Sequence, residues 1–374
     1  MRIAVFGGSG FLGYDFVRLA LRRGGVEPVV YSSGTGSVAN LARHGIDLRF
    51  YSPADLESVV LDADTDTVVN FAHPFERGSR GGGDEQIRRF VRFISNAKRA
   101  NPSLRLVHLS SMAVYEPFTE SHAPVETDPL RPPRDDRYAQ EKVLAETMLL
   151  QLPDAGRWQL HLRPTIVYGP FCRPFTDRFF EAFRQGDVGY LALSGRIQPI
   201  FGADISRFIY DRLFKFTTGV YNLPGPEEMS WHAFVKTFRD IVDVGRLVLM
   251  PEGQAGSGPK TSYKDDLRRL MLAVRREPAF ERMATRLTRR LPGAAAHKAK
   301  AFLLGPGDSG TVTTVESRTE NTALLGRPYF AQNRLVSDAK FRREFPEERL
   351  SRVSDVTPVL EKYYRFRFSD CRIA

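Results

Sequence analysis

The sequence contains very little cysteine and no long apolar run. Cys172 and Cys371 are its two cysteines, and they form neither a disulfide framework nor a metal-ligand spacing. The absence of any run of 18 or more apolar residues excludes a membrane-spanning helix by hydropathy. The opening "MRIAVFGG" turns glycine-rich too soon for a signal peptide. We therefore expect a cytoplasmic protein without a metal site.

Acidic residues are the scarcer charged class. The 374 residues include 54 Lys and Arg against 44 Asp and Glu, a formal net charge of +10 that indicates anionic partners. Hydrophobic residues make up 42% of the chain, which is enough for a sizeable core and excludes a disordered protein.

Short apolar segments alternate with helical patterns in the first half of the chain. They cover residues 2–7, 27–33, 47–52, 66–73, 104–111 and 158–164. Strands this apolar, separated by helices, predict an α/β fold with a Rossmann-type doubly wound parallel sheet. Because the pattern loosens later, we expect a dinucleotide-binding domain over 1–165, to which segments near 197–225 return, and a smaller, partly helical substrate-binding region over 166–374.

A glycine-rich turn, "FGGSGFLG" (6–13), follows the first predicted strand and opens the first helix. Its spacing fits both G-x-G-x-x-G and G-x-x-G-x-x-G. Glycine permits the tight turn and the approach of the backbone to a pyrophosphate, which then faces the helix N-terminus. A plain glycine turn is the alternative, but the strand before and the helix after favour a dinucleotide. The residues assigned to this site are Gly7, Gly8, Gly10, Phe11, Leu12 and Gly13.

The second predicted strand does not end in an acidic residue. A carboxylate there would hold the ribose hydroxyls of NAD. The chain instead has Ser32 and Ser33, whose hydroxyls could bind a 2′-phosphate, and Arg43, whose guanidinium could reach it. We therefore predict that NADP(H) is favoured over NAD(H). In the alternative interpretation the serines only form a turn.

Candidate catalytic groups, two hydroxyls and an ammonium, lie after the later predicted strands. In "RYAQEKVLAE" (137–146), Tyr138 and Lys142 are one helical turn apart and leave the same face. An ammonium near a phenol favours the phenolate, which makes the tyrosine a better base. A surface helix pair would show the same spacing. Ser111 ends a buried strand where a ligand would lie in a doubly wound sheet.

Four motifs then occur in order: the glycine turn, "SSMAVY" (110–115), "YAQEK" (138–142) and "RPTIVYGP" (163–170). This order resembles the extended short-chain dehydrogenase/reductase family, in its nucleotide-sugar epimerase and dehydratase branch, over roughly residues 1–245. The resemblance implies Ser111, Tyr138 and Lys142 as catalytic residues and a homodimer. It also implies cofactor contacts from Tyr138, Lys142, Phe71, Ala72, Pro164 and Val167.

The sequence departs from that family pattern at several positions. Met112 and Ala113 follow Ser111, where 4,6-dehydratases carry an Asp-Glu pair, and this argues against dehydration. Glu116 replaces a glycine. His73, beside Pro74, is more readily interpreted as a packed loop residue than as a cofactor contact, and "RGSRGGGDE" (77–85) is predicted to be a loop.

These observations predict an NAD(P)-dependent epimerase or ketoreductase that acts on a carbinol or carbonyl carbon of a nucleotide-activated sugar. Ser111 and Met112 would face the substrate, and Arg173, Arg178 and Arg207 could bind its diphosphate. A carbonyl reductase of a non-sugar substrate and a non-catalytic cofactor-binding scaffold remain alternatives.

Residues 256–300 hold 12 Lys and Arg against 4 Asp and Glu. Apolar residues at helical spacing predict two helices over 260–291, within an insertion at about 251–330. These helices either pack on the substrate region with a solvated basic face or contact an anionic surface. Nucleic acid is not expected, because few aromatic residues interleave the arginines.

Overall fold

The computed structural model describes residues 1–34, 38–73, 82–119, 121–190, 193–249 and 328–368. By contacts between its residues the chain divides into two units. The first comprises Met1–Val188, Ala192–Val248 and Arg327–Ala374, and the description below concerns this unit. The predicted basic helices over 260–291, nearly all of the 251–330 insertion, and Cys371 lie outside the described residues.

A seven-stranded parallel sheet forms the centre of the fold, in the order β11-β6-β5-β4-β1-β2-β3. Its strands are β1 (Arg2–Phe6), β2 (Glu27–Ser32), β3 (Asp47–Phe50), β4 (Thr65–Asn70), β5 (Arg105–Leu109), β6 (Gln159–Pro164) and β11 (Gly219–Leu223). The order reverses between β1 and β4, which is the switch point where doubly wound sheets bind ligands. The predicted fold class is confirmed.

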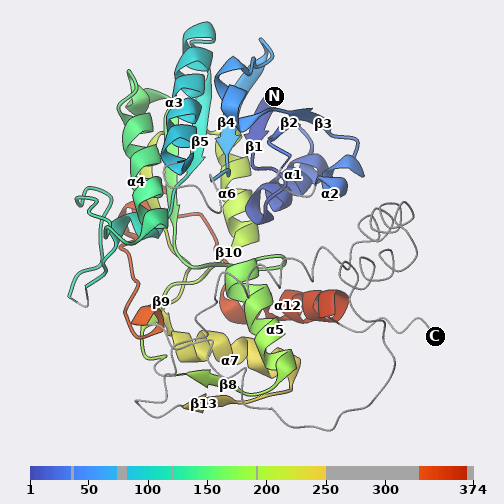
Figure 1. The fold of residues 1–374 in the computed structure, drawn as a ribbon, viewed down its shortest axis with the longest axis vertical. Coiled ribbons are helices and arrows are strands. Elements are labelled where there is room, and N and C mark those ends of the chain that lie inside the picture. Colours follow the sequence, from blue (N-terminus) through green and yellow to red (C-terminus); the bar gives the residue numbers. More distant parts are fainter. Residues whose placement is uncertain (35–37, 74–81, 120, 191–192, 250–327, 369–374) are drawn as a thin grey trace, which may run out of the picture. The chain divides into compact units, whose positions relative to one another are not determined.

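Two apolar layers cover the two faces of this sheet (Figure 1). On β1, Ile3 and Val5 lie in one buried cluster, with helices α1 (Phe11–Arg23) and α6 (Gly202–Phe214). Ala4 and Phe6 lie in the other, with α3 (Gly82–Ala100) and α4 (Arg137–Leu150). Alternate strand residues therefore face opposite layers, as the pleat requires, and the strands read as continuous apolar runs because both faces are buried.

The remaining elements are short or belong to the second half of the chain. They are α2 (Ala39–Ala42), η1 (Pro53–Ser58), η2 (Met112–Tyr115), η3 (Ala155–Arg157), β7 (Val167–Tyr168), η4 (Arg173–Asp177), α5 (Arg178–Gln185), β8 (Val188–Tyr190), β9 (Arg196–Ile197), β10 (Ile200–Phe201), β12 (Met229–Ser230), α7 (Trp231–Val242), β13 (Leu247–Leu249), η5 (Pro328–Phe330), α11 (Ala339–Glu344) and α12 (Val353–Phe368). Among the described helices, none is long and apolar enough to cross a membrane.

Aromatic side chains hold the helices of the second half together. Phe180 of α5 contacts Phe238 of α7 and Tyr364 of α12, with ring centroids 5.2 and 5.0 Å apart. Asp204 of α6 accepts a hydrogen bond from the backbone nitrogen of Ser351 at 2.7 Å. These contacts attach the C-terminal segment to α5, α6 and α7.

One loop prediction is wrong at its end. Residues 77–85 read as a loop because of their glycines, but α3 begins at Gly82. Asp84 and Glu85 lie in its first turn, where negative charge stabilises a helix N-terminus. Residues 77–81 lie outside the described part of the chain.

Candidate active site

The turn between β1 and α1 approaches the loop after β4 very closely. Gly7 has a φ of +76°, and a Cβ there would lie 2.6 Å from the backbone nitrogen of Ala72, so only glycine fits. A Cβ at Gly13 would overlap the carbonyl oxygen of Gly7. Gly10 caps α1 without a side chain, which leaves the amide groups of the first turn available to an anion. The turn therefore has the form of a phosphate cradle.

The other residues predicted to flank this cradle have packing contacts. Phe11 and Leu12 lie close to Gly202, the first residue of α6, where a Cβ would be 2.7 Å from the Phe11 ring. Phe71 packs its ring 5.4 Å from that of Phe16 on α1. Gly8 lies against Val30 of β2. These contacts fix the position of the turn over the sheet.

The predicted ribose selectors do not all lie together. Ser32 is buried and its hydroxyl accepts a hydrogen bond from the backbone nitrogen of Gly34 at 3.2 Å, which is a turn contact. Ser33 lines a cavity beside the sheet. Arg43, the C-cap of α2, is exposed and does not line this cavity. Of the three, Ser33 has the position from which a ligand could be contacted directly.

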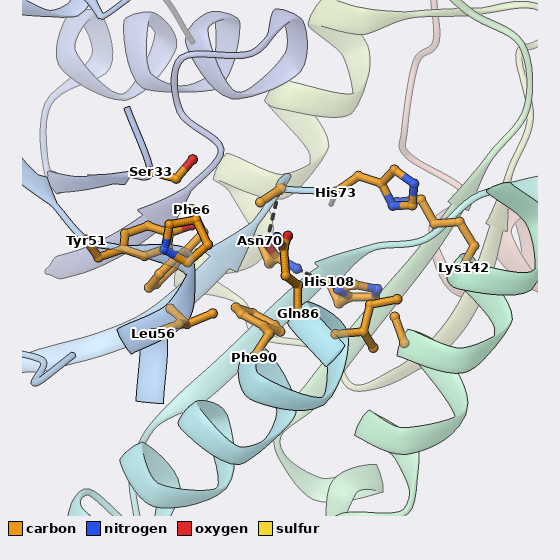
Figure 2. Close-up of a pocket in the computed structure, with 14 residues that line it drawn as sticks. Phe6, Ser33, Tyr51, Leu56, Asn70, His73, Gln86, Phe90, His108 and Lys142 are labelled. Carbon is orange, nitrogen blue, oxygen red and sulfur yellow. Dashed lines mark hydrogen bonds between the residues drawn. The ribbon is translucent and has the colours of Figure 1, made fainter. Parts of the chain in front are cut away.

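A cavity of about 220 Å³ lies between the carboxyl ends of the strands and helices α3 and α4 (Figure 2). Ser33, Tyr51 and Phe6 lie at one end of the view, and His73 and Lys142 lie at the other. Its lining is Phe6, Ser33, Tyr51, Pro53, Leu56, Asn70, Ala72, His73, Gln86, Ile87, Phe90, His108, Lys142 and Ala145. The fold thus brings a predicted cofactor residue and a predicted catalytic residue to the same cavity.

Asn70 and His108 are among the polar side chains that line this cavity and that sequence reasoning did not select. Asn70 Oδ1 accepts from the backbone nitrogen of Ala72 at 3.0 Å, so its Nδ2 is the atom that donates to His108 Nδ1 at 3.1 Å. Burial, followed by the charge of neighbouring groups, lowers the pKa of His108 well below its usual range. The imidazole is therefore neutral, with its proton on Nε2. Both are polar residues inside otherwise apolar strands, which is the signal that could have identified them.

Ser111, Tyr138 and Lys142 come together at the carboxyl ends of β5 and the start of α4. The Ser111 side chain lies beside the Tyr138 phenol, where it favours the phenolate and lowers the pKa of the tyrosine. Lys142 is buried, and its Nζ donates to the carbonyl oxygen of Leu109 at 2.9 Å while lying 5.8 Å from the centroid of the Tyr138 ring. Tyr138 is 41% exposed as a residue, but its hydroxyl is the enclosed end.

Burial dominates the acidity of both groups. It lowers the pKa of Lys142 to about 8, against the opposing effect of the carboxylates of Glu146 and Glu141. It raises the pKa of Tyr138, and Ser111 offsets only part of this. The sequence suggested a phenol whose pKa is lowered by the lysine; in the structure desolvation is the larger effect. Tyr138 therefore carries its proton at neutral pH in the protein by itself.

His73 was expected to be a packed loop residue, and the structure places it against Tyr138. The two rings are 4.9 Å apart between centroids at 72°, an edge-to-face contact. His73 Nε2 lies 3.1 Å from a carboxylate oxygen of Glu141. In the sequence "YAQEK", Glu141 lies between Tyr138 and Lys142. Sequence reasoning missed Glu141 entirely, although a carboxylate between these two residues was a signal.

The segments after β6 have structural partners. Pro164 ends β6, and Val167 of β7 pairs with Ile200. Arg163 forms an ion pair with Glu146, and both side chains are buried. Thr165 donates a hydrogen bond to the carbonyl oxygen of Gln198. Whether Pro164 and Val167 contact a cofactor stays a prediction.

The residues predicted for substrate lie in different surroundings. Met112 is buried in η2, directly after Ser111. Arg173 is exposed at the start of η4, and Arg178 begins α5 half-buried. Arg207 already donates to Asp204 at 3.1 Å and to the carbonyl oxygen of Arg349. Their role in binding a diphosphate stays a prediction. Among the described residues no group of three or more His, Cys, Asp or Glu could hold a metal ion.

Residues 3–188 match the model of the NAD dependent epimerase/dehydratase family. Through this segment the chain belongs to that family. No curated protein sequence matches the chain.

Solved structures share the fold at low identity. A dTDP-glucose 4,6-dehydratase, DesIV from Streptomyces venezuelae with NAD and TYD bound, is 18% identical, with 98% of both chains covered and a TM-score of 0.62. The UDP-glucose 4-epimerase from Thermus thermophilus, complexed with NAD, is 22% identical over 72% of this chain and 97% of that chain, with a TM-score of 0.54. A dTDP-glucose 4,6-dehydratase from Bacillus anthracis is 21% identical over 67% and 85%, with a TM-score of 0.55.

Proposed function

We propose that this protein is an NAD(P)-dependent oxidoreductase or epimerase that acts on a carbinol or carbonyl carbon of a nucleotide-activated sugar, with Ser111, Tyr138 and Lys142 as its catalytic residues. The observation that supports this best is the grouping of the three side chains. The Ser111 side chain lies beside the Tyr138 phenol, and the buried Lys142 ammonium lies 5.8 Å from the centroid of the phenol ring, beside the cavity that also reaches Ser33.

Each residue then has a chemical role. Tyr138, protonated at neutral pH, donates its proton to the oxygen of a carbonyl as that oxygen gains charge, and accepts it in the reverse direction. Ser111 donates a hydrogen bond to the same oxygen and stabilises its charge. The ammonium of Lys142 stabilises the phenolate that Tyr138 becomes. A bound nicotinamide dinucleotide supplies or accepts the hydride.

The residues present fit such a cofactor. The uncapped start of α1 and the close approach of Gly7 to Ala72 suit a pyrophosphate. The apolar end of the cavity, with Tyr51, Leu56 and Phe90, suits an aromatic ring. NADP(H) is our proposed preference, because β2 ends in serines and lacks the carboxylate that would bind two ribose hydroxyls.

The substrate class rests on the family and on the structural neighbours, whose names include UDP-glucose and dTDP-glucose enzymes. Dehydration is disfavoured, because Met112 and Ala113 follow Ser111 and supply no acid to expel a hydroxyl. Arg173 and Arg178 are the candidates for the diphosphate. A homodimer, a cytoplasmic location and contact of 256–300 with an anionic surface stay predictions.

Two measurements test the proposal. The first asks whether the purified, desalted protein still absorbs in the band of reduced nicotinamide, as an epimerase that retains its cofactor would. The second is turnover of UDP- and dTDP-hexoses and their keto forms with NADPH or NADH. Turnover only of non-sugar carbonyls would support the simple reductase instead. Cofactor binding without any turnover would support a scaffold.

A further inference from the structure

His73 is held beside the reactive end of Tyr138. Its ring meets the Tyr138 ring edge to face, at 4.9 Å and 72°, a geometry that stabilises aromatic pairs. The phenol oxygen has a separate contact with Ser111. One contact therefore fixes the hydroxyl and another fixes the ring, in a residue that is 41% exposed.

Glu141 orients His73 in turn. One carboxylate oxygen lies 3.1 Å from His73 Nε2, and the other accepts a hydrogen bond from Arg137 Nε at 2.7 Å. The His73 and Glu141 side chains are only 8% and 6% exposed. Gly83 on α3 makes room for this carboxylate, because a Cβ there would overlap Glu141 Oε1. Three elements, the end of β4, α3 and α4, thus enclose one buried acid.

The contact with Glu141, at 3.1 Å from Nε2, decides the tautomer of the imidazole. Burial, and then the charge of Lys142, lower the pKa of His73 to about 3, so the ring is neutral. A carboxylate oxygen accepts hydrogen bonds, and the proton of the neutral ring therefore lies on Nε2. His73 is one of the positions at which the sequence departs from the family pattern. The family pattern therefore does not account for this arrangement.

We propose that His73 and Glu141 are positioning residues for this reaction: His73 holds the Tyr138 ring in line with Ser111, and Glu141 both orients His73 and adds negative charge beside Lys142. This rests on the proposed function, because it assigns the pair a task in proton transfer by Tyr138.

The charged groups around Lys142 determine how Glu141 affects the pKa of the lysine. Its own helix provides Glu141, Glu146 and the Tyr138 phenol, the end of β4 provides His73, and β5 provides His108. Both imidazoles are neutral, so the two carboxylates are the charged partners that favour the ammonium. Loss of one carboxylate lets Lys142 lose its proton at lower pH.

The kinetic test compares variants across neutral and alkaline pH. His73→Ala should lower kcat about 2- to 10-fold with little change in KM, the loss expected for one aromatic contact. His73→Phe keeps a ring at the same place and should recover most of kcat. Glu141→Gln can still accept the hydrogen bond from His73, but should move the alkaline limb of the kcat profile to lower pH. His122→Ala, an exposed histidine paired with Asp128, is the matched control and should be unchanged.

A second readout does not depend on activity. Long-range ¹H–¹⁵N NMR should show His73 as the neutral Nε2–H tautomer throughout the same pH range. The inference is overturned if His73→Ala keeps the full kcat, if His73→Phe is no better than Ala, if Glu141→Gln leaves the alkaline limb in place, or if NMR finds the other tautomer. If instead Tyr138→Phe keeps full activity, the proposed function fails, and NMR still decides whether His73 donates from Nε2 to Glu141.

Discussion

Glu116 and Arg334 form a buried ion pair between residues 218 positions apart in the sequence. The Arg334 and Glu116 side chains are 6% and 9% exposed, and the guanidinium lies 3.5 Å from the centroid of the Tyr329 ring. Arg334 also donates its backbone N–H to the carbonyl oxygen of Arg196 at 2.7 Å. The ion pair thereby attaches the C-terminal segment beside the turn that follows Ser111. The family pattern has a glycine at the position of Glu116.

We expect Arg334→Met to be strongly destabilising. It leaves the Glu116 carboxylate buried without its partner, which costs about 3–5 kcal/mol in comparable pairs. Urea unfolding followed by circular dichroism would measure the loss. The double variant Glu116→Gln with Arg334→Met should recover part of it, because the uncompensated charge is gone. A single variant as stable as the parent would show that the pair contributes little.

Tyr138→Phe should lower kcat by about a hundredfold or more, the effect of losing an acid–base group. The ring and its contact with His73 remain, so the fold should be unchanged. Fluorescence titration with NADPH should give nearly the parent affinity. Turnover at the parent rate would remove Tyr138 from the mechanism.

Lys142 should make stability depend on alkaline pH. An unfolded lysine has its usual pKa of 10.5, and burial lowers that of folded Lys142 to about 8. Below pH 8 both states hold the proton, and the folded state bears the full cost of a buried ammonium. Between pH 8 and 10.5 the unfolded state binds more protons, so the free energy of unfolding rises with pH, and above 10.5 the penalty is absent.

Lys142→Met removes this penalty. We expect the variant to be more stable than the parent at pH 7 by a few kcal/mol, less the loss of the hydrogen bond to Leu109. The difference should shrink as the pH rises from 8 toward 10.5. Chemical denaturation of both proteins at neutral and alkaline pH measures this difference in the free energy of unfolding. The contributions of other titrating groups cancel, because the two proteins share them. A constant difference would mean that Lys142 does not titrate in this range.

Ser33→Asp should reverse the cofactor preference from NADPH toward NADH. Ser33 lines the cavity at the end of β2, where a carboxylate would repel a 2′-phosphate and accept hydrogen bonds from ribose hydroxyls. Ser32→Asp serves as the comparison, because Ser32 is buried and bonded to Gly34. Parallel fluorescence titrations with the two cofactors decide. Tighter NADH binding by the unmodified protein would contradict the predicted preference for NADP(H).

The sheet could be predicted because its strands are buried on both faces and read as unbroken apolar runs. The catalytic grouping could be predicted because Tyr138 and Lys142 share a helix face by spacing alone. His73 could not be assigned in the same way. Its contact depends on where the end of β4 meets α4, and on the space left by Gly83 for Glu141. Such contacts join distant segments, and no local periodicity reports them.

The position of β11 has a consequence for how the chain can be divided. β6 pairs with β11, and α1 packs against α6, yet β11 and α6 follow residue 188, where the family match ends. A fragment comprising residues 1–188 would carry an open β6 edge with unpaired amide and carbonyl groups, and an uncovered apolar stripe on α1. We therefore expect the segment that matches the family model to be less stable by itself and to self-associate through the open β6 edge.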